Sequence, residues 1–164
     1  AAARLFAAEL LLQVDKVLII DVGDLVMLGD IGELWAEFDR FDSQQMMGFA
    51  TESGSVFHVG ATTTFRGDNV TGVLPQKGVQ PGVAAYNLER IRRYRGPAGT
   101  WSETLLRAAH QAASHSCSIL ANPEMTTLNT ALVDRRHLWY ELSSLWNYLP
   151  DVAWEISSHT TTFE

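Results

Sequence analysis

Short apolar runs alternate along this chain with segments in which apolar residues recur every three or four positions. Residues 17–20, VLII, form a continuous apolar run, which predicts a buried strand. Further strands are predicted at residues 44–50, 82–87 and 137–142. Helices are predicted at residues 1–13, 31–41, 88–94, 100–114 and 124–133. Strands that alternate with helices indicate the α/β class.

The predicted helix at residues 31–41 has the clearest pattern. Its apolar positions follow the spacing i, i+3, i+4 and i+7, at Ile31, Leu34, Trp35 and Phe38. Asp30 directly precedes it, and aspartate is a favoured N-cap because its side chain accepts from free backbone N–H groups. We therefore expect Asp30 to cap the helix, although it lies close to Asp21 and Asp24 in the sequence.

Residues 51–82 have no regular hydrophobic pattern and contain six of the twelve glycines. A long irregular segment inside a compact domain is usually functional or disordered. It includes the N-glycosylation sequon Asn69-Val70-Thr71, which matters only in a lumenal or secreted protein.

The composition excludes some functional classes. A length of 164 residues fits one domain, and a net charge of −7 argues against non-specific binding to nucleic acid or an anionic membrane. The four arginines within residues 90–95 therefore predict a solvated helix face. No apolar run approaches the ~18–20 residues of a membrane span. Cys117 is the only cysteine, so neither an intrachain disulfide nor a cysteine metal cluster can form.

Two carboxylates follow the first predicted strand. Asp21 stands directly after it, and Asp24 lies within one further turn. Ligands bind beyond the carboxyl ends of strands in open α/β sheets, and paired carboxylates suit Mg²⁺ or Mn²⁺. On residue types alone, a polar turn between two strands explains the pair equally well. The chain has no glycine-rich phosphate loop, no HExxH and no GxSxG.

The stretch RLFAAELLLQVDKVLIIDVGDLVMLGDIGELW resembles the central motif of the family 8 retaining glycosyltransferases. These glycogenin-like enzymes include the Golgi glucoside xylosyltransferases and the xylosyl-glucuronyltransferases. In them an arginine-leucine helix leads to a strand, an Asp-x-Asp motif, Gly-Asp and a Leu-Trp helix. Three later stretches agree in order, GVAAYNLERIR, TTLNTAL and LWNYLPD. The last is most similar to the glucoside xylosyltransferase branch.

The resemblance implies a GT-A-like fold, a mainly parallel sheet flanked by helices. It also implies a single glycosyltransferase domain over residues 1–164. Because the chain lacks the family's nucleotide-binding N-terminal unit and its C-terminal His and Lys-Pro-Trp segment, we expect a domain that is incomplete at both ends. The family binds a UDP-sugar with Mn²⁺ or Mg²⁺ and transfers the sugar with retention. We expect xylose or glucose as the sugar, and a glycan or glycoprotein as the acceptor. The branch implies the Golgi or ER lumen, and a glycogenin-like role would imply the cytoplasm.

The resemblance also implies site residues. Arg4 matches the helix arginine that faces the sugar-diphosphate. Gln80, which precedes Pro81 and Gly82, stands where the family has a sugar-contacting asparagine, so Gln80 and Gly82 are expected to bind the substrate. Glu124 stands at the first position of the family's Asp-Gln-Asp motif and is expected to be catalytic, near the transferred sugar.

Asp21 and Asp24 occupy the family's metal motif, in which the ion acts as a Lewis acid on the leaving UDP. The motif is one residue longer here than Asp-x-Asp. A bulge at Val22-Gly23 would therefore be needed to bring both carboxylates to one ion.

Further departures from the family pattern leave two other hypotheses open. Met125 and Thr126 replace the last two residues of Asp-Gln-Asp, and a methionine cannot hydrogen-bond a sugar as an amide does. A non-catalytic binding or interaction module on the same scaffold is therefore the second hypothesis. The third is a metal site for phosphate-ester hydrolysis, formed by the two aspartates with Glu52 and supported by those carboxylates alone. His159 comes early in the sequence for the family's third metal ligand.

Overall fold

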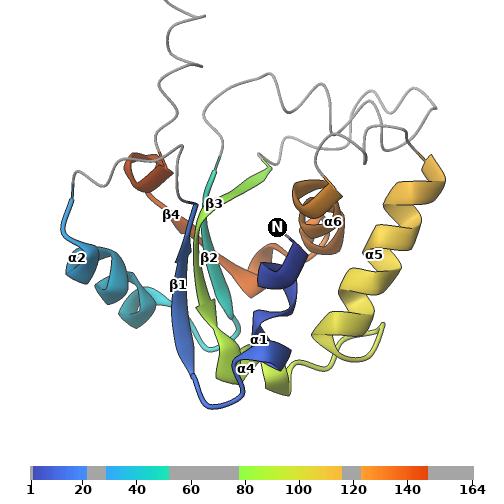
Figure 1. Ribbon diagram of the computed structural model, residues 1–164, viewed down its shortest axis with the longest axis horizontal. Helices are drawn as coiled ribbons and strands as arrows, with labels where there is room; N and C mark the ends of the chain where they lie inside the picture. Colours follow the sequence, from blue (N-terminus) through green and yellow to red (C-terminus); the bar gives the residue numbers. More distant parts are fainter. Residues whose placement is uncertain (1, 22–28, 52–77, 116–122, 148–164) are drawn as a thin grey trace, which may run out of the picture.

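The computed structural model describes residues 2–21, 29–51, 78–115 and 123–147. At its centre is a four-stranded sheet with the strand order β1-β3-β2-β4 (Figure 1). The strands are β1 (Lys16–Ile20), β2 (Met47–Thr51), β3 (Val79–Asn87) and β4 (Trp139–Leu142).

Three strands of the sheet share one direction. Strand β3 is antiparallel to both β1 and β2, and β4 is parallel to β2. The carboxyl ends of β1, β2 and β4 therefore lie at the same edge as the amino end of β3. This edge brings Asp21, which follows β1, next to residues 79–82.

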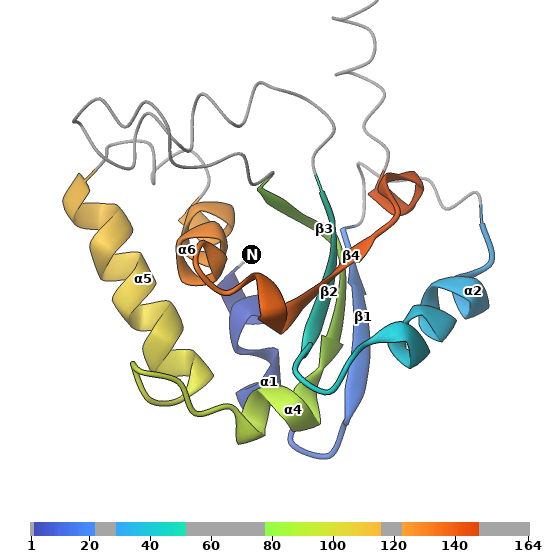
Figure 2. The same ribbon diagram turned by 180° about the vertical axis from the view of Figure 1, so that it is seen from behind.

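Helices cover both faces of the sheet. Helix α2 (Ile31–Ala36) and the 3-10 helix η2 (Glu37–Arg40) lie on one face, and η1 (Ala2–Phe6), α1 (Ala7–Leu10), α5 (Trp101–His115) and α6 (Pro123–Leu132) on the other (Figures 1 and 2). The remaining helices are α4 (Leu88–Arg93), η4 (Arg136–Leu138) and η5 (Ser144–Asn147). The α/β fold predicted from the sequence, with its sheet flanked by helices, is confirmed. No helix in the described ranges is long and apolar enough to cross a bilayer.

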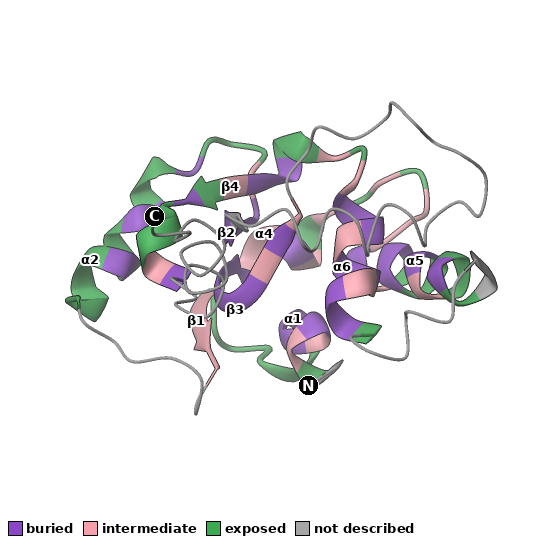
Figure 3. Cartoon of the chain, turned by 90° about the horizontal axis from the view of Figure 1, so that it is seen from above, coloured by how far each residue is buried: buried purple, intermediate pink, exposed green. Residues whose placement is uncertain are grey.

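The sheet separates a large core from a smaller one, and Figure 3 shows the buried residues gathered between the layers. Phe49, Leu105 and Leu128 belong to the large core, whereas Leu34, Val83 and Leu142 form the smaller one. Side chains of β1 alternate between the two cores, which explains why a strand covered on both faces is a continuous apolar run in the sequence.

The N-cap prediction is confirmed, and several element boundaries differ from those predicted. The Asp30 side chain accepts from the backbone N–H of Gly32 at 2.7 Å and starts α2. The helix predicted at 31–41 continues as a 3-10 turn after Ala36, and the helix predicted at 1–13 ends at Leu10. Strand β4 begins at Trp139, after a 3-10 turn that takes up the first two residues of the predicted strand.

Strand β3 begins three residues before the predicted position, because Val79 and Gln80 pair with Thr51 and Ala50 of β2, and a side chain from α6 holds its first residue. Asn129 accepts from the N–H of Val79 at 2.8 Å through Oδ1 and donates to its carbonyl at 3.2 Å through Nδ2. Its amide thereby takes the place of a neighbouring strand. The β2–β3 register also shifts between Phe49 and Ala50, opposite the part of β3 that contains Pro81.

Several sequence predictions fall outside the described residues. They concern Asp24 and the bulge expected at Val22-Gly23, the sequon Asn69-Val70-Thr71, Glu52 and His159.

Candidate functional site

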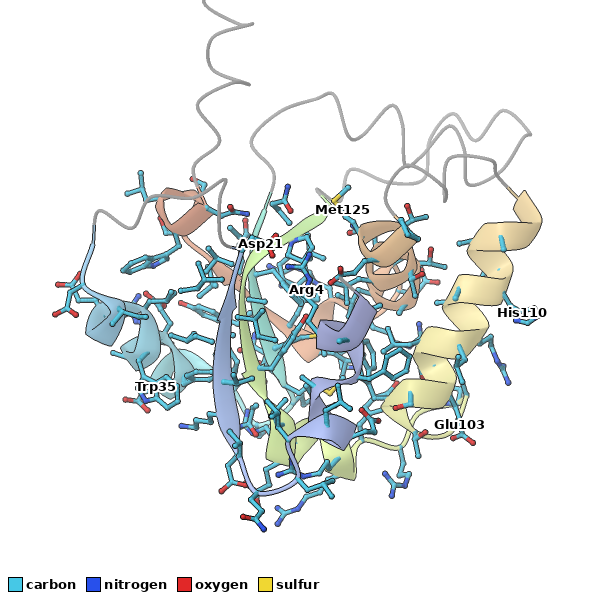
Figure 4. The ribbon with its side chains drawn as sticks, viewed as in Figure 1. Arg4, Asp21, Trp35, Glu103, His110 and Met125 are labelled. Atoms are coloured by element: carbon cyan, nitrogen blue, oxygen red, sulfur yellow. The ribbon has the colours of Figure 1, made fainter. Side chains whose placement is uncertain are left out.

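A cluster of charged side chains lies at the edge of the sheet where β1 ends and β3 begins. Arg4 comes from η1, Asp21 directly follows β1, and Glu124 belongs to the first turn of α6. Figure 4 shows Arg4 and Asp21 close together beside this edge. The position agrees with the general rule that α/β sheets bind ligands beyond the carboxyl ends of their strands.

The guanidinium of Arg4 connects three separate segments. Its Nη1 donates to Oδ1 of Asp21 at 2.6 Å and to the carbonyl of Pro81 at 3.1 Å. Its Nε donates to Oε1 of Glu124. The structure therefore brings together Arg4, Asp21, Glu124 and the start of β3. The family resemblance had implied that all of them belong to one site.

The two carboxylates that hold Arg4 differ in their exposure to water. The side chain of Asp21 is 43% exposed, whereas that of Glu124 is 3% exposed. Oε2 of Glu124 is buried and has no hydrogen-bond partner among the residues that the structure describes. A buried carboxylate of this kind depends on its counter-ion, because burying an unpaired charge is costly.

The local electrostatics keep Arg4 charged. Burial lowers the pKa of Arg4, but the hydrogen bonds to Glu124 and Asp21 and the attraction of both carboxylates outweigh that effect and raise it above its usual value. Burial, together with the negative charge of Glu124, raises the pKa of the nearby Tyr86, so its hydroxyl stays neutral. Within the described ranges this hydroxyl has no hydrogen-bond partner, and the ring borders a cavity of about 10 Å³ next to Arg4, roughly the size of one water molecule.

The predicted substrate-binding residues of β3 lie at the same edge. The backbone N–H of Asp21 donates to the carbonyl of Gly82 at 2.9 Å, which ties β1 to β3. Oε1 of Gln80 accepts from the N–H of Gly82 at 3.3 Å. A Cβ at Gly82 would lie only 3.0 Å from Oδ1 of Asn147, so this glycine lets η5 pack closely against β3.

Asn147 and Tyr86 are buried polar residues of this region that the sequence did not single out. Asn147 is 7% exposed, and its Nδ2 has no hydrogen-bond partner in the part of the chain that the structure describes. The available signal was its place in LWNYLPD, one of the stretches that carry the family resemblance. Tyr86 lies in GVAAYNLERIR, another of these stretches, but a tyrosine in an apolar strand is also an ordinary core residue.

The described residues supply one ligand suited to a divalent cation. Asp21 is partly exposed, Arg4 contacts only its Oδ1, and carboxylate oxygens are the ligands that Mg²⁺ and Mn²⁺ prefer. Asp24, Glu52 and His159 lie outside the described residues. Within the described ranges no group of three or more His, Cys, Asp or Glu could hold a metal. Asp21 fits as one ligand, and the second aspartate remains a prediction.

His110 and Met125 do not belong to the charged cluster. His110 is exposed on α5, well away from Arg4 and Asp21 (Figure 4). Met125, next to Glu124 on α6, is 5% exposed and belongs to the buried apolar residues.

Comparison with solved structures identifies the kind of fold. The sequence matches no protein-family model and no curated protein. The structure is similar to the crystal structure of mouse xyloside xylosyltransferase 1 in its apo form, with a TM-score of 0.63 and 21% sequence identity. The chain has a glycosyltransferase-like fold. The match covers 87% of this chain and 51% of the mouse chain, so this chain spans about half the length of that protein.

Proposed function

We propose that this chain binds a UDP-sugar at the Arg4 edge and acts in a family 8 retaining glycosyltransferase. The transferred sugar is xylose or glucose, and the acceptor is a glycan or glycoprotein. The observation that carries the proposal is the meeting of Arg4, Asp21 and Glu124 at the carboxyl end of β1. The fold similarity to a xylosyltransferase and the family resemblance of the same residues support it. A location in the Golgi or ER lumen follows from the xylosyltransferase branch, and one in the cytoplasm from a glycogenin-like role.

In this proposal each residue of the edge has a separate part. Arg4 offers a fixed positive charge to the diphosphate, because arginine is always ionised and its planar fork matches phosphate oxygens. Asp21, together with Asp24, holds Mn²⁺ or Mg²⁺, which when bound supplies Lewis-acid stabilisation of the leaving UDP. Gln80 and Gly82 border the sugar, and Glu124, the residue expected to be catalytic, takes part in the site through its ion pair with Arg4.

The test is calorimetry with UDP, with and without Mn²⁺, on the wild type and Asp21→Ala. We expect metal-dependent binding to the wild type and its loss in Asp21→Ala. Asp134→Ala is the matched control, because Asp134 is an exposed carboxylate in the turn after α6. Unchanged UDP affinity in Asp21→Ala would refute the metal assignment.

A non-catalytic binding module is the second candidate, and Met125 favours it. The buried thioether stands where the family has an amide that contacts the sugar, and it offers no comparable donor. Turnover of UDP-xylose and UDP-glucose, measured on this chain and on any longer protein that contains it, separates the candidates. UDP binding without release of UDP from either donor would support the binding module. If UDP neither binds nor shifts the unfolding temperature, the chain is a scaffold without a nucleotide site.

A further inference from the structure

We propose that Glu124 is a positioning residue that retains Arg4 through Nε while the Nη groups of Arg4 exchange Asp21 for phosphate oxygens of the ligand. The inference rests on the proposed function, because it takes a diphosphate to be part of the ligand. It gives the two carboxylates different roles, a permanent partner on α6 and an exchangeable partner after β1.

Burial separates the two ion pairs of Arg4. Because Glu124 is 3% exposed, water and salt do not compete for its contact with Nε. The side chain of Asp21 is 43% exposed, so solvent screens its contact with Nη1 and reduces the cost of breaking it. Glu124 also belongs to the hydrogen-bonded helix α6 and cannot follow a ligand outward.

The geometry of the guanidinium allows both contacts at once. Arginine has five N–H donors in one plane, and its Nη1–Nη2 edge can meet two phosphate oxygens while Nε keeps another acceptor. In the structure Nη1 binds Asp21 and the carbonyl of Pro81. Within the part of the chain that the structure describes, no acceptor contacts Nη2. The Nη1–Nη2 edge of the guanidinium can therefore bind an anion.

The charge balance favours exchange over simple addition. Arg4 contributes one positive charge between two carboxylates, so the three side chains carry a net negative charge that repels an incoming anion. When a phosphate replaces Asp21, Arg4 still has two anionic partners, one buried and one supplied by the ligand.

The probe is inorganic pyrophosphate without metal, in the presence of a chelator, titrated calorimetrically into the full 164-residue chain. Asp21→Asn should raise pyrophosphate affinity about tenfold, because it removes the competing carboxylate, and Arg4→Lys should lower affinity by about tenfold. Glu124→Gln should lower it as well, because we expect the weaker hold of a neutral amide on Nε to outweigh the reduced repulsion of the anion. Asp134→Asn controls for the loss of one negative charge elsewhere on the surface.

A double-mutant cycle separates positioning from general support of the fold. If Glu124 acts through Arg4, then Glu124→Gln lowers pyrophosphate affinity in the wild type and has no further effect in Arg4→Lys. An equal loss of affinity in both backgrounds would mean a merely structural role and overturn the proposal. Thermal unfolding of each variant confirms that the compared proteins are folded.

The outcomes also separate this inference from the proposed function. Binding of UDP with Mn²⁺, combined with a pyrophosphate affinity that fails to rise in Asp21→Asn, overturns the exchange alone. A rise in pyrophosphate affinity without any UDP binding supports the exchange and removes the UDP-sugar proposal.

Discussion

The guanidinium of Arg4 holds together residues that lie 17 and 120 positions away from it in the sequence. Its importance comes from where its partners lie. Asp21 remains in contact with water, but Glu124 is enclosed by α6 and the large core. A buried carboxylate that loses its only counter-ion must remain charged in an apolar environment or take up a proton, and both cost stability.

Arg4→Met should therefore destabilise the fold by about 3 kcal/mol, since removing one partner of a buried ion pair leaves an uncompensated charge. Adding Glu124→Met should restore much of the loss, because the double variant buries no charge. Urea unfolding of the wild type, both single variants and the double variant measures the coupling. A double variant no more stable than Arg4→Met would show that the pair is not the source of the loss.

The burial of Tyr86 leads us to expect a specific loss of stability at high pH. Burial raises the pKa of Tyr86 in the folded protein above its usual value of 10.0. The neutral Tyr86 hydroxyl therefore contributes its full share to the free energy of unfolding below about pH 10. This contribution declines as the pH rises further, because the tyrosine releases its proton at a lower pH in the unfolded chain than in the folded protein. Tyr86→Phe should remove this decline. Comparing unfolding temperatures at pH 8 and pH 11 tests the prediction, with the half-buried Tyr94→Phe as control. An equal alkaline loss in the wild type and Tyr86→Phe would contradict it.

At the scale of elements, helix α5 starts with a reciprocal cap. The N–H of Thr100 donates to Oε2 of Glu103 at 2.6 Å, and the N–H of Glu103 donates to Oγ1 of Thr100 at 3.3 Å. The backbone hydrogen bond from Thr100, followed by the one from its hydroxyl, lowers the pKa of Glu103. This is the Thr-x-x-Glu capping box, in which each side chain satisfies a free backbone donor.

Thr100→Ala should lower the free energy of unfolding by about 1 kcal/mol, because α5 loses the side-chain acceptor at its first turn. Thr100→Ser keeps the hydroxyl and should remain close to the wild type. Chemical unfolding monitored by circular dichroism measures both variants. Equal losses in the two would point to the threonine methyl group, and would rule out the cap as the cause.

The arginines of α4 show how an element can differ from its predicted role. The sequence indicated that these arginines form a solvated face, and this prediction is only partly correct. Arg90 donates to the carbonyl of Gln45 at 2.6 Å and also to that of Asp42. Arg92 donates to the carbonyls of Leu11 and Val14. These two arginines join the segments before β1 and β2 to α4, contacts that depend on tertiary proximity alone.

At the scale of the whole molecule, the sheet joins the site residues into one unit. Strands β1 and β3 form the edge, and helices on the large-core face supply Arg4 and Glu124. A ligand that binds this edge in the folded state alone should raise the unfolding temperature of the entire domain. The UDP and Mn²⁺ experiment therefore has a second readout, a thermal shift in the wild type that is absent in Asp21→Ala.

The sequence by itself determined the α/β class, the approximate positions of the strands and the Asp30 cap, because these depend on local periodicity and local hydrogen bonds. It also indicated Arg4, Asp21 and Glu124 through the family resemblance. Only the tertiary structure decided that one guanidinium joins them, that Glu124 is buried while Asp21 is partly exposed, and that Asn129 binds the backbone of Val79 at the start of β3. Burial and ion pairing arise from residues that are distant in the sequence, and local patterns do not encode those distances.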